Sequence, residues 1–376
     1  MKLRHRALLR AGVAATAFVA ASTAFAAPAF ADDTADLGVA LAGTTLAPGT
    51  DDKFATISLS NAGPSTAGHI LVAIDVSQLD MSKVEWTDDS CGEPEDDTYL
   101  CTPTSGTLAS GATQDWWFPL TKKAGATGPA GTITVSVKHG GTDPNPKNDT
   151  ATAKVVVSEE SGADILVWAP DVYQWDEEAG FFSSEPIEPG GESRVYVEVL
   201  NAGDRAAKGL AFKVSLPEHV TLTEPEDECD FSADQRVATC DYADMELATF
   251  STDPDKAFAK FFWSVKVDES APAPATLHGT VTAAAIEEIE PPALLRKSNA
   301  PVAAELPEHF KDVDKSDNTD DFGIFVAKAG GTGGGLPVTG PAAGIIGGVG
   351  AAVVLAGVAM FFVARRRRIV TVTPDA

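Results

Sequence analysis

The stretch FATISLSNAGPSTAGHILVAIDVSQLD, residues 54–80, alternates apolar and polar side chains on both sides of an Asn-Ala-Gly sequence. Ile70, Val72, Ile74 and Val76 occupy every second position, which is the period of a β-strand with one buried face. Asn, Gly and Pro between the two apolar runs are typical of a turn. The stretch therefore predicts two strands joined by a short polar turn.

A second stretch, SRVYVEVLNAGDRAAKGLAFKVSLPEHV at residues 193–220, repeats this pattern. Its alternating apolar residues are Leu210, Phe212, Val214 and Leu216, and Asn201 follows Asn61 by 140 positions. Later landmarks recur in the same order. Trp116-Trp117-Phe118 matches Phe261-Phe262-Trp263, and the acidic turn DPNPKNDTA (143–151) matches DKSDNTDDF (314–322). Such self-similarity indicates an internal duplication.

The short strands are separated by Gly, Pro, Asn and Asp, and no long segment of 3.6-residue period appears, which favours an all-β chain of two tandem β-sandwiches. We expect the first sandwich at residues 33–158 and the second at 162–328. The second copy is longer, and we place its insertion at about residues 283–312.

Both ends of the chain carry targeting patterns. Residues 1–31 combine Lys2, Arg4, Arg6 and Arg10 with a small apolar run, which predicts a secretory signal peptide cleaved after Ala31 or Ala26. Near the other end, residues 341–364 are long enough and apolar enough to cross a bilayer as a helix. The basic tail 365–376 begins with Arg365, Arg366, Arg367 and Arg368, which predict a stop-transfer signal on the cytoplasmic side.

Directly before that apolar span stand Leu336, Pro337, Val338, Thr339 and Gly340, preceded by a Gly-rich linker at 329–335. The pentapeptide, the span and the short basic tail together resemble the LPxTG cell-wall sorting signal of Gram-positive surface proteins. The resemblance implies that a sortase cleaves between Thr339 and Gly340 and joins Thr339 to a peptidoglycan precursor, after a membrane-inserted intermediate. It implies a secreted protein located in the cell wall.

The repeated units are similar to the DUF11-type and related Ig-like repeats of bacterial surface proteins, although NAGDRAA in the second copy departs from NAGPSTA in the first. This resemblance implies two Ig-like domains with a structural or adhesive role. Two rival hypotheses are a wall-associated hydrolase with an unrecognised active site and an ectodomain that is simply anchored in the membrane.

The cysteines follow the duplication, because Cys91 and Cys101 in the first copy align with Cys229 and Cys240 in the second. An even number of cysteines in a secreted chain predicts disulfides, and the duplication predicts the local pairs Cys91–Cys101 and Cys229–Cys240. A metal site is the alternative, but it needs four ligands in one place, whereas these pairs belong to separate units.

The charge of the chain narrows the possible partners. Of its 28 Lys and Arg, four lie in the leader and four in the tail, so 20 remain between residues 32 and 339 against 53 Asp and Glu, a net charge of −33. We therefore expect no nucleic-acid partner. The six histidines are scattered singly and no nucleophile elbow or phosphate-binding loop appears, so we expect no enzyme.

Two segments are candidate binding sites. DVDKSDNTDD (312–321) is superficially similar to a calcium loop, with Asp312, Asp314 and Asp317 as candidate ligands, but it lacks the Gly and Glu of an EF-hand. A turn that caps the last strand is the alternative, which we favour. The aromatic-rich segment 166–186 suits either recognition of a glycan or protein ligand or, as we favour, packing in the core.

Overall fold

The computed structural model describes residues 34–86, 91–92, 94–103, 106–224, 227–289 and 312–328. Strands form almost all of the regular structure of these residues, and their one helical element is a 3₁₀ turn at Pro254–Lys256. The prediction of an all-β chain built of sandwiches is confirmed. The described residues belong to one compact unit, which contains two large hydrophobic cores.

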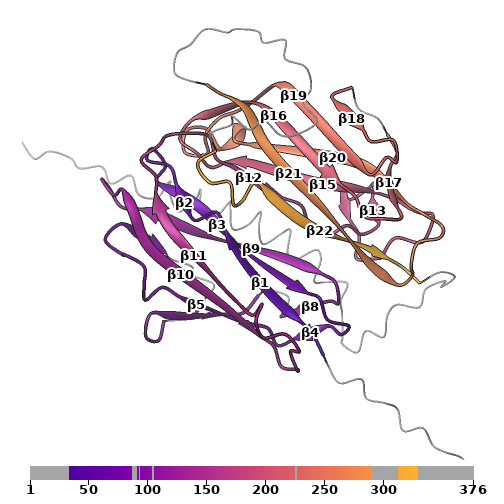
Figure 1. Cartoon of the computed structure of the whole chain (residues 1–376), viewed down its shortest axis with the longest axis horizontal. Helices are drawn as coiled ribbons and strands as arrows, with labels where there is room; N and C mark the ends of the chain where they lie inside the picture. Colours follow the sequence, from indigo (N-terminus) through magenta and orange to yellow (C-terminus); the bar gives the residue numbers. More distant parts are fainter. Residues whose placement is uncertain are drawn as a thin grey trace, which may run out of the picture. The chain divides into compact units, whose positions relative to one another are not determined.

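The first sandwich, drawn in indigo to magenta in Figure 1, has a four-stranded and a five-stranded sheet. The four-stranded sheet has the order β1 (Leu37–Ala42), β3 (Asp52–Asn61), β9 (Thr113–Lys122), β6 (Val84–Trp86). The five-stranded sheet has the order β2 (Thr45–Leu46), β11 (Thr150–Val157), β10 (Gly128–Lys138), β5 (Leu71–Asp75), β7 (Thr98–Cys101). A two-stranded sheet joins β4 (Ala67–Gly68) to β8 (Thr107–Leu108).

The second sandwich repeats this arrangement. Its four-stranded sheet has the order β12 (Ile165–Trp168), β15 (Glu192–Asn201), β20 (Phe258–Val267), β17 (Val220–Leu222). Its five-stranded sheet has the order β18 (Cys229–Phe231), β19 (Val237–Leu247), β16 (Ala206–Ser215), β21 (Ala275–Ile289), β22 (Thr319–Val326). A hairpin of β13 (Trp175–Asp176) and β14 (Phe181–Phe182) has no counterpart in the strands of the first sandwich.

Strand registers correspond between the two copies. Ile57 of β3 lies opposite Trp116 of β9, and Val197 of β15 lies opposite Phe261 of β20. Phe118 and Trp263, two positions further along, are both buried between the sheets, whereas Trp117 and Phe262 point to the outer faces. The aromatic triplets matched in the sequence thus occupy equivalent positions.

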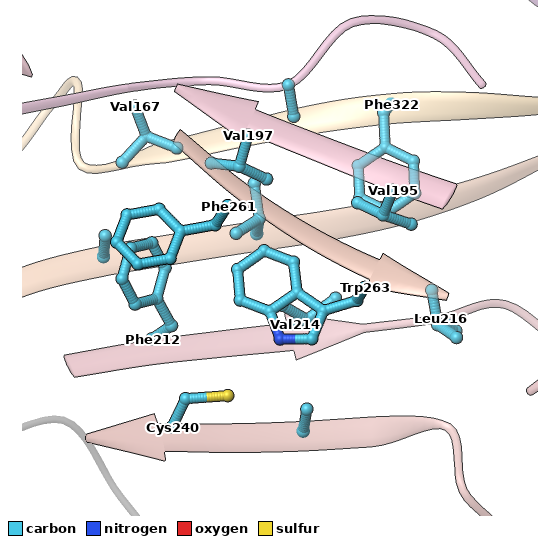
Figure 2. Packing of buried hydrophobic residues seen from close by; sticks show 14 of the residues in the cluster. Val167, Val195, Val197, Phe212, Val214, Leu216, Cys240, Phe261, Trp263 and Phe322 are labelled. Carbon is cyan, nitrogen blue, oxygen red and sulfur yellow. The ribbon is translucent and has the colours of Figure 1, made fainter. Parts of the chain in front are cut away.

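Each core forms because the inward residues of both sheets are apolar and alternate with more exposed ones. In the second sandwich, Phe212 of β16 meets Phe261 and Trp263 of β20, with ring centroids 4.3 and 5.5 Å apart. Figure 2 shows these rings between the strands, with Val195, Val197 and Val214 around them.

Asn61 and Asn201 make matching hydrogen bonds, which explain the repeated Asn-Ala-Gly. Asn61 Nδ2 donates to the carbonyls of Ser65 and Leu108, both at 2.9 Å, and its Oδ1 accepts from Gly63 N at 3.0 Å. In the second copy, Asn201 Nδ2 donates to Arg205 O and Leu247 O, and its Oδ1 accepts from Gly203 N at 3.1 Å. One buried amide therefore closes each turn onto a neighbouring segment.

The glycine of each motif allows the chain to pass close to the segment before the first strand. A Cβ atom on Gly63 would lie 2.4 Å from Asp36 N, and one on Gly203 would lie 2.3 Å from Gly162 O. Both positions need glycine because a side chain there would collide with backbone.

Candidate functional site

The segments that carry the targeting predictions lie outside the described residues. They are the signal peptide 1–31, the linker 329–335, the sorting motif Leu336–Gly340, the apolar span 341–364 and the tail 365–376 with Arg365–Arg368. Most of the expected insertion, residues 290–311, also lies outside them, while residues 283–289 continue β21. Among the helices of the described residues, none has the length and apolarity that a membrane crossing requires.

The two predicted disulfides are confirmed, since Cys91 is bonded to Cys101 and Cys229 to Cys240. They occupy corresponding places, because Cys101 lies opposite Val72 of β5 and Cys240 lies opposite Phe212 of β16. Disulfides of this kind are typical of secreted and extracellular proteins.

The acidic turn before the last strand has the same backbone role in both sandwiches. Asp312 Oδ2 accepts a hydrogen bond from Ile165 N, at the start of β12, at 3.1 Å. Its counterpart Asp143 Oδ2 accepts one from Leu37 N, at the start of β1, at 2.9 Å. The loop at 312–318 therefore acts as a capping turn that holds the first strand of its sandwich.

Two carboxylates of this second turn, together with Asp164, also surround the ammonium group of a lysine from the first sandwich. Lys53 Nζ lies 2.6 Å from Asp164 Oδ2, 3.0 Å from Asp317 Oδ2 and 3.3 Å from Asp314 Oδ2. The Lys53 side chain is fully buried. We refer to these residues with Asp312 as the Lys53 cluster.

Neighbouring backbone of the first sandwich fixes the turn against Lys53. Thr45 N donates to Asp314 Oδ2 at 2.7 Å, and Gly43 N donates to Ser316 Oγ at 3.0 Å. Lys53 lies on the inward side of β3, in line with Ala55, so the strand itself directs its side chain into the protein. The Lys53 cluster thus joins the two sandwiches by direct contacts.

The cluster contains one cation and four carboxyl groups, and burial strongly opposes their full ionisation. Burial raises the pKa of Asp164 and that of Asp312 to about 7, and it raises the pKa of Asp317 well above its usual value. Burial alone would also raise the pKa of Asp314, but Lys53 and hydrogen bonds lower it on balance. For Lys53, burial lowers the pKa, yet attraction to Asp164, Asp317 and Asp314 outweighs burial and raises it. The cluster therefore keeps a charged lysine and binds protons at its carboxylates.

Three buried oxygens of the cluster have no hydrogen-bond partner among the described residues, namely Asp164 Oδ1 and both carboxylate oxygens of Asp317, of which Oδ2 is ion-paired with Lys53. The candidate calcium ligands Asp312, Asp314 and Asp317 do come together, but with Lys53 Nζ next to two of them. Within the described ranges, no group of three or more His, Cys, Asp or Glu side chains is arranged to hold a metal ion.

A second pair of carboxyl groups joins the sandwiches through β9 and β22. Asp115 of β9 and Asp320 of β22 are hydrogen bonded to each other through their side chains. Burial and the neighbouring Asp115 raise the pKa of Asp320 to about 9, and burial also raises the pKa of Asp115. Burial and mutual repulsion therefore favour protonation of this pair.

The segment 166–186 places its aromatic residues other than Tyr173 on the outer face of the sheet that contains β12, β15 and β20. Trp117 of the first sandwich contacts Trp168, with ring centroids 5.4 Å apart, and Trp168 contacts Tyr196 at 6.0 Å. The chain of rings then continues through Phe262, Trp175, Phe181 and Phe182. We call these seven rings the aromatic surface.

The aromatic surface is partly open to solvent, because Phe262 is 37% exposed and every other ring except Tyr196 is half-buried. Tyr173, by contrast, stacks on Phe325 at 4.5 Å and belongs to the packing of the protein. The segment therefore divides between the two roles considered for it, with Tyr173 in the interior and Trp175, Phe181 and Phe182 at the surface.

Sequence reasoning did not identify Lys53, although a signal was present. Lys53 precedes Ala55, Ile57 and Leu59 at the same alternating positions, so the strand period places it on the buried face. A lysine there needs a buried anionic partner. The partner carboxylates, more than 100 residues away along the chain, carry no comparable signal.

No family model and no curated protein matches this chain. Solved structures match at low similarity. The α2-macroglobulin of Salmonella is 11% identical with a TM-score of 0.25, over 79% of this chain and 16% of that one. Red sea bream transglutaminase is 12% identical with a TM-score of 0.22, over 78% of this chain and 31% of that one. The Enterococcus faecalis MSCRAMM ACE, described as binding its ligands by the collagen Hug model, is 11% identical with a TM-score of 0.21, over 78% of this chain and 96% of that one.

This chain therefore spans 16 to 22% of the length of these α2-macroglobulins.

Proposed function

We propose that this chain is a surface protein that a sortase attaches covalently to peptidoglycan through Thr339, with the two sandwiches as a structural or adhesive ectodomain. The observation that carries the proposal is the order Leu336–Gly340, apolar span 341–364 and Arg365–Arg368. Each part has a physical task, because the span pauses the chain in the membrane while the arginines keep its end in the cytoplasm.

The motif itself suits a groove-binding enzyme. Pro337 fixes its own backbone angle and biases Leu336 toward an extended conformation, so the peptide is presented much like a strand. The two disulfides support a location outside the cytoplasm. The acidic, disulfide-bonded β-sandwich unit supports a role in display or binding, and we assign it no catalytic activity.

The experiment follows the protein into the wall. Cells that express the full chain are fractionated, the wall is digested with a muramidase, and the released protein is analysed by mass spectrometry. We expect a mature chain that ends at Thr339 and carries a peptidoglycan fragment. The variant Pro337→Ala should accumulate in the membrane with its tail, whereas Val338→Ala, at the variable position of the motif, should still reach the wall.

Recovery of wild-type protein in membranes with Arg365–Arg368 intact would instead identify a simple membrane anchor. Hydrolysis of wall polymers by the purified chain would favour the rival enzyme.

A further inference from the structure

We infer that the β13–β14 hairpin carries a binding site for a basic segment of a polypeptide partner, with an arginine or lysine side chain inserted beside Trp175. This inference develops the adhesive role proposed above by naming the chemistry of the ligand. It does not depend on how the protein is anchored, because the site lies entirely within the described residues.

A pocket of about 360 Å³ lies along the hairpin, lined by Gln174, Trp175, Asp176, Glu177, Glu178, Ser183 and Glu185. Backbone hydrogen bonds fix its two sides. Gln174 N donates to Glu185 O at 2.9 Å, and Ser183 N donates to Gln174 O at 2.8 Å. The backbone that carries the pocket is therefore held in place before a ligand binds, which lowers the entropic cost of binding.

Four of the seven lining residues are acidic, and two of them, Glu178 and Glu185, are not neutralised by a cation among the described residues. Glu177 pairs with Arg194 at 2.8 Å. The exposed carboxylates of Glu178 and Glu185 have no ion pair within the part of the chain that the structure describes. Asp176 Oδ1 accepts from the backbone N–H groups of Glu178 and Ala179, which holds the hairpin tip in place. The pocket thus offers negative charge to a cationic side chain.

The indole ring of Trp175 packs against other rings of the aromatic surface. It contacts Phe182 and Phe262 edge-on, with ring centroids 5.4 and 5.6 Å apart. A half-buried indole next to carboxylates is a favourable neighbour for a cation, because the ring face carries negative electrostatic potential.

The same surface already binds two of the protein's own cations in this manner. The guanidinium of Arg194 lies 5.1 Å from the centroid of Trp175 and pairs with Glu177. The ammonium of Lys260 lies 5.7 Å from the centroid of Tyr196 and pairs with Glu198 at 2.9 Å. Trp175 also lines the pocket, so a partner's arginine bound by Glu178 and Glu185 would lie beside the same indole that Arg194 contacts. The net charge of −33 between residues 32 and 339 would attract a basic partner and repel an acidic one.

The test uses the full chain in detergent and a fluorescein-labelled tetra-arginine peptide, with binding followed by fluorescence anisotropy. We expect saturable binding that weakens as salt rises from about 50 to about 300 mM. The double variant Glu178→Gln/Glu185→Gln should raise the Kd about 10-fold, and Trp175→Leu about 3-fold. The matched control Glu159→Gln/Glu160→Gln removes two exposed carboxylates outside the pocket and should change the Kd less than about 2-fold.

Three results would overturn the inference. One is the absence of saturable binding, and another is equal weakening by the pocket and control variants, which would indicate attraction to the acidic surface as a whole. The third is binding of a neutral oligosaccharide at Trp175 that the two glutamine substitutions do not change. If Trp175→Leu fails to fold, the glutamine variants decide, since both positions are exposed.

Discussion

The turn at 143–149 in the first sandwich and the turn at 312–318 in the second have the same backbone role but different side chains. Asn148 O accepts from Val39 N at 3.0 Å, and the corresponding Asp317 O accepts from Val167 N at 2.9 Å. In the first turn the side chain at this position is a neutral amide, whereas in the second it is a carboxylate beside Lys53. A duplicated turn can thus keep its capping role while its side chains acquire a separate one.

The aspartates of the two turns contribute to stability in two ways, some through contacts within one sandwich and some through contacts between the sandwiches. Asp143 and Asp312 hold the first strand of their own sandwich, so their role is complete within one copy. Asp314 and Asp317 contact a lysine of the other copy, so their role exists only when both sandwiches are in place. Substitutions should therefore act differently on the two copies at the Lys53 cluster and alike at the disulfides and at Asn61 and Asn201.

The largest effect is expected from Lys53→Met. Removing the ammonium leaves the carboxyl groups of the Lys53 cluster buried without their cation, which should cost about 5 kcal/mol of unfolding free energy. Urea denaturation at neutral pH measures this loss. Lys138→Met, an exposed position on β10, serves as the control and should change stability by less than about 0.5 kcal/mol. A loss below about 1 kcal/mol in the Lys53 variant would falsify the role of the cluster.

The difference between features within one copy and contacts between the copies also explains which features the sequence predicted. The strands around Asn61 and Asn201 and both disulfides were predictable because the signals lie in short segments and occur twice. The Lys53 cluster was not, because its two parts are far apart in the chain and occur only once.

The aromatic surface was predictable only in part. The aromatic residues of the segment 166–186 are visible in the sequence. Which of them lie in the interior, as Tyr173 does, and which lie at the surface, as Trp175 does, depends on the hairpin turn between Asp176 and Phe181. The Asp115–Asp320 pair gave no signal, since acidic residues are common throughout the chain.

The next effect is a dependence of stability on pH that arises from Asp164 in the Lys53 cluster. Because burial raises the pKa of Asp164 from 3.8 to about 7, its stabilising contribution is complete below about pH 4 and is lost as pH rises through 7. Over this window we therefore expect the free energy of unfolding to fall.

Asp164→Asn should remove that part of the slope in urea titrations between pH 4 and 8, since the amide oxygen can still accept from Lys53. Glu160→Gln, at an exposed position, should leave the slope as it is in the wild type. A wild-type protein that becomes more stable across this window would contradict the direction of the shift.

The two disulfides should stabilise the folded chain by similar amounts. The Cys91–Cys101 and Cys229–Cys240 loops span 10 and 11 residues, so each should stabilise the folded chain by about 2.8 kcal/mol through the unfolded state. Cys91→Ala/Cys101→Ala and Cys229→Ala/Cys240→Ala are compared in the same denaturation assay. A difference of more than about 1.5 kcal/mol between them would show that the copies use their disulfides differently.

The smallest effect concerns the repeated turns, and it tests the equivalence of the copies most directly. Asn61→Ala and Asn201→Ala each remove one amide that serves two carbonyls, a glycine N–H and the N–H of Asp36 or Asp164. Some of the freed groups are only part-buried and regain hydrogen bonds from water, so we expect about 2 kcal/mol from each rather than the sum of the bonds. The exposed Asn145→Ala should cost less than about 0.5 kcal/mol.

Equal losses at Asn61 and Asn201 would mean that the turn is stabilised within each copy and that the Lys53 cluster does not affect it. A loss at Asn201 well above that at Asn61 would mean that the second turn also supports the contact between the sandwiches. The second result is physically possible because Asn201 Oδ1 accepts from Asp164 N at 3.2 Å, and Asp164 is the residue that binds Lys53 most closely. Combining Asn201→Ala with Lys53→Met in a double-mutant cycle separates the two cases, since independent sites give additive losses and a coupled pair does not.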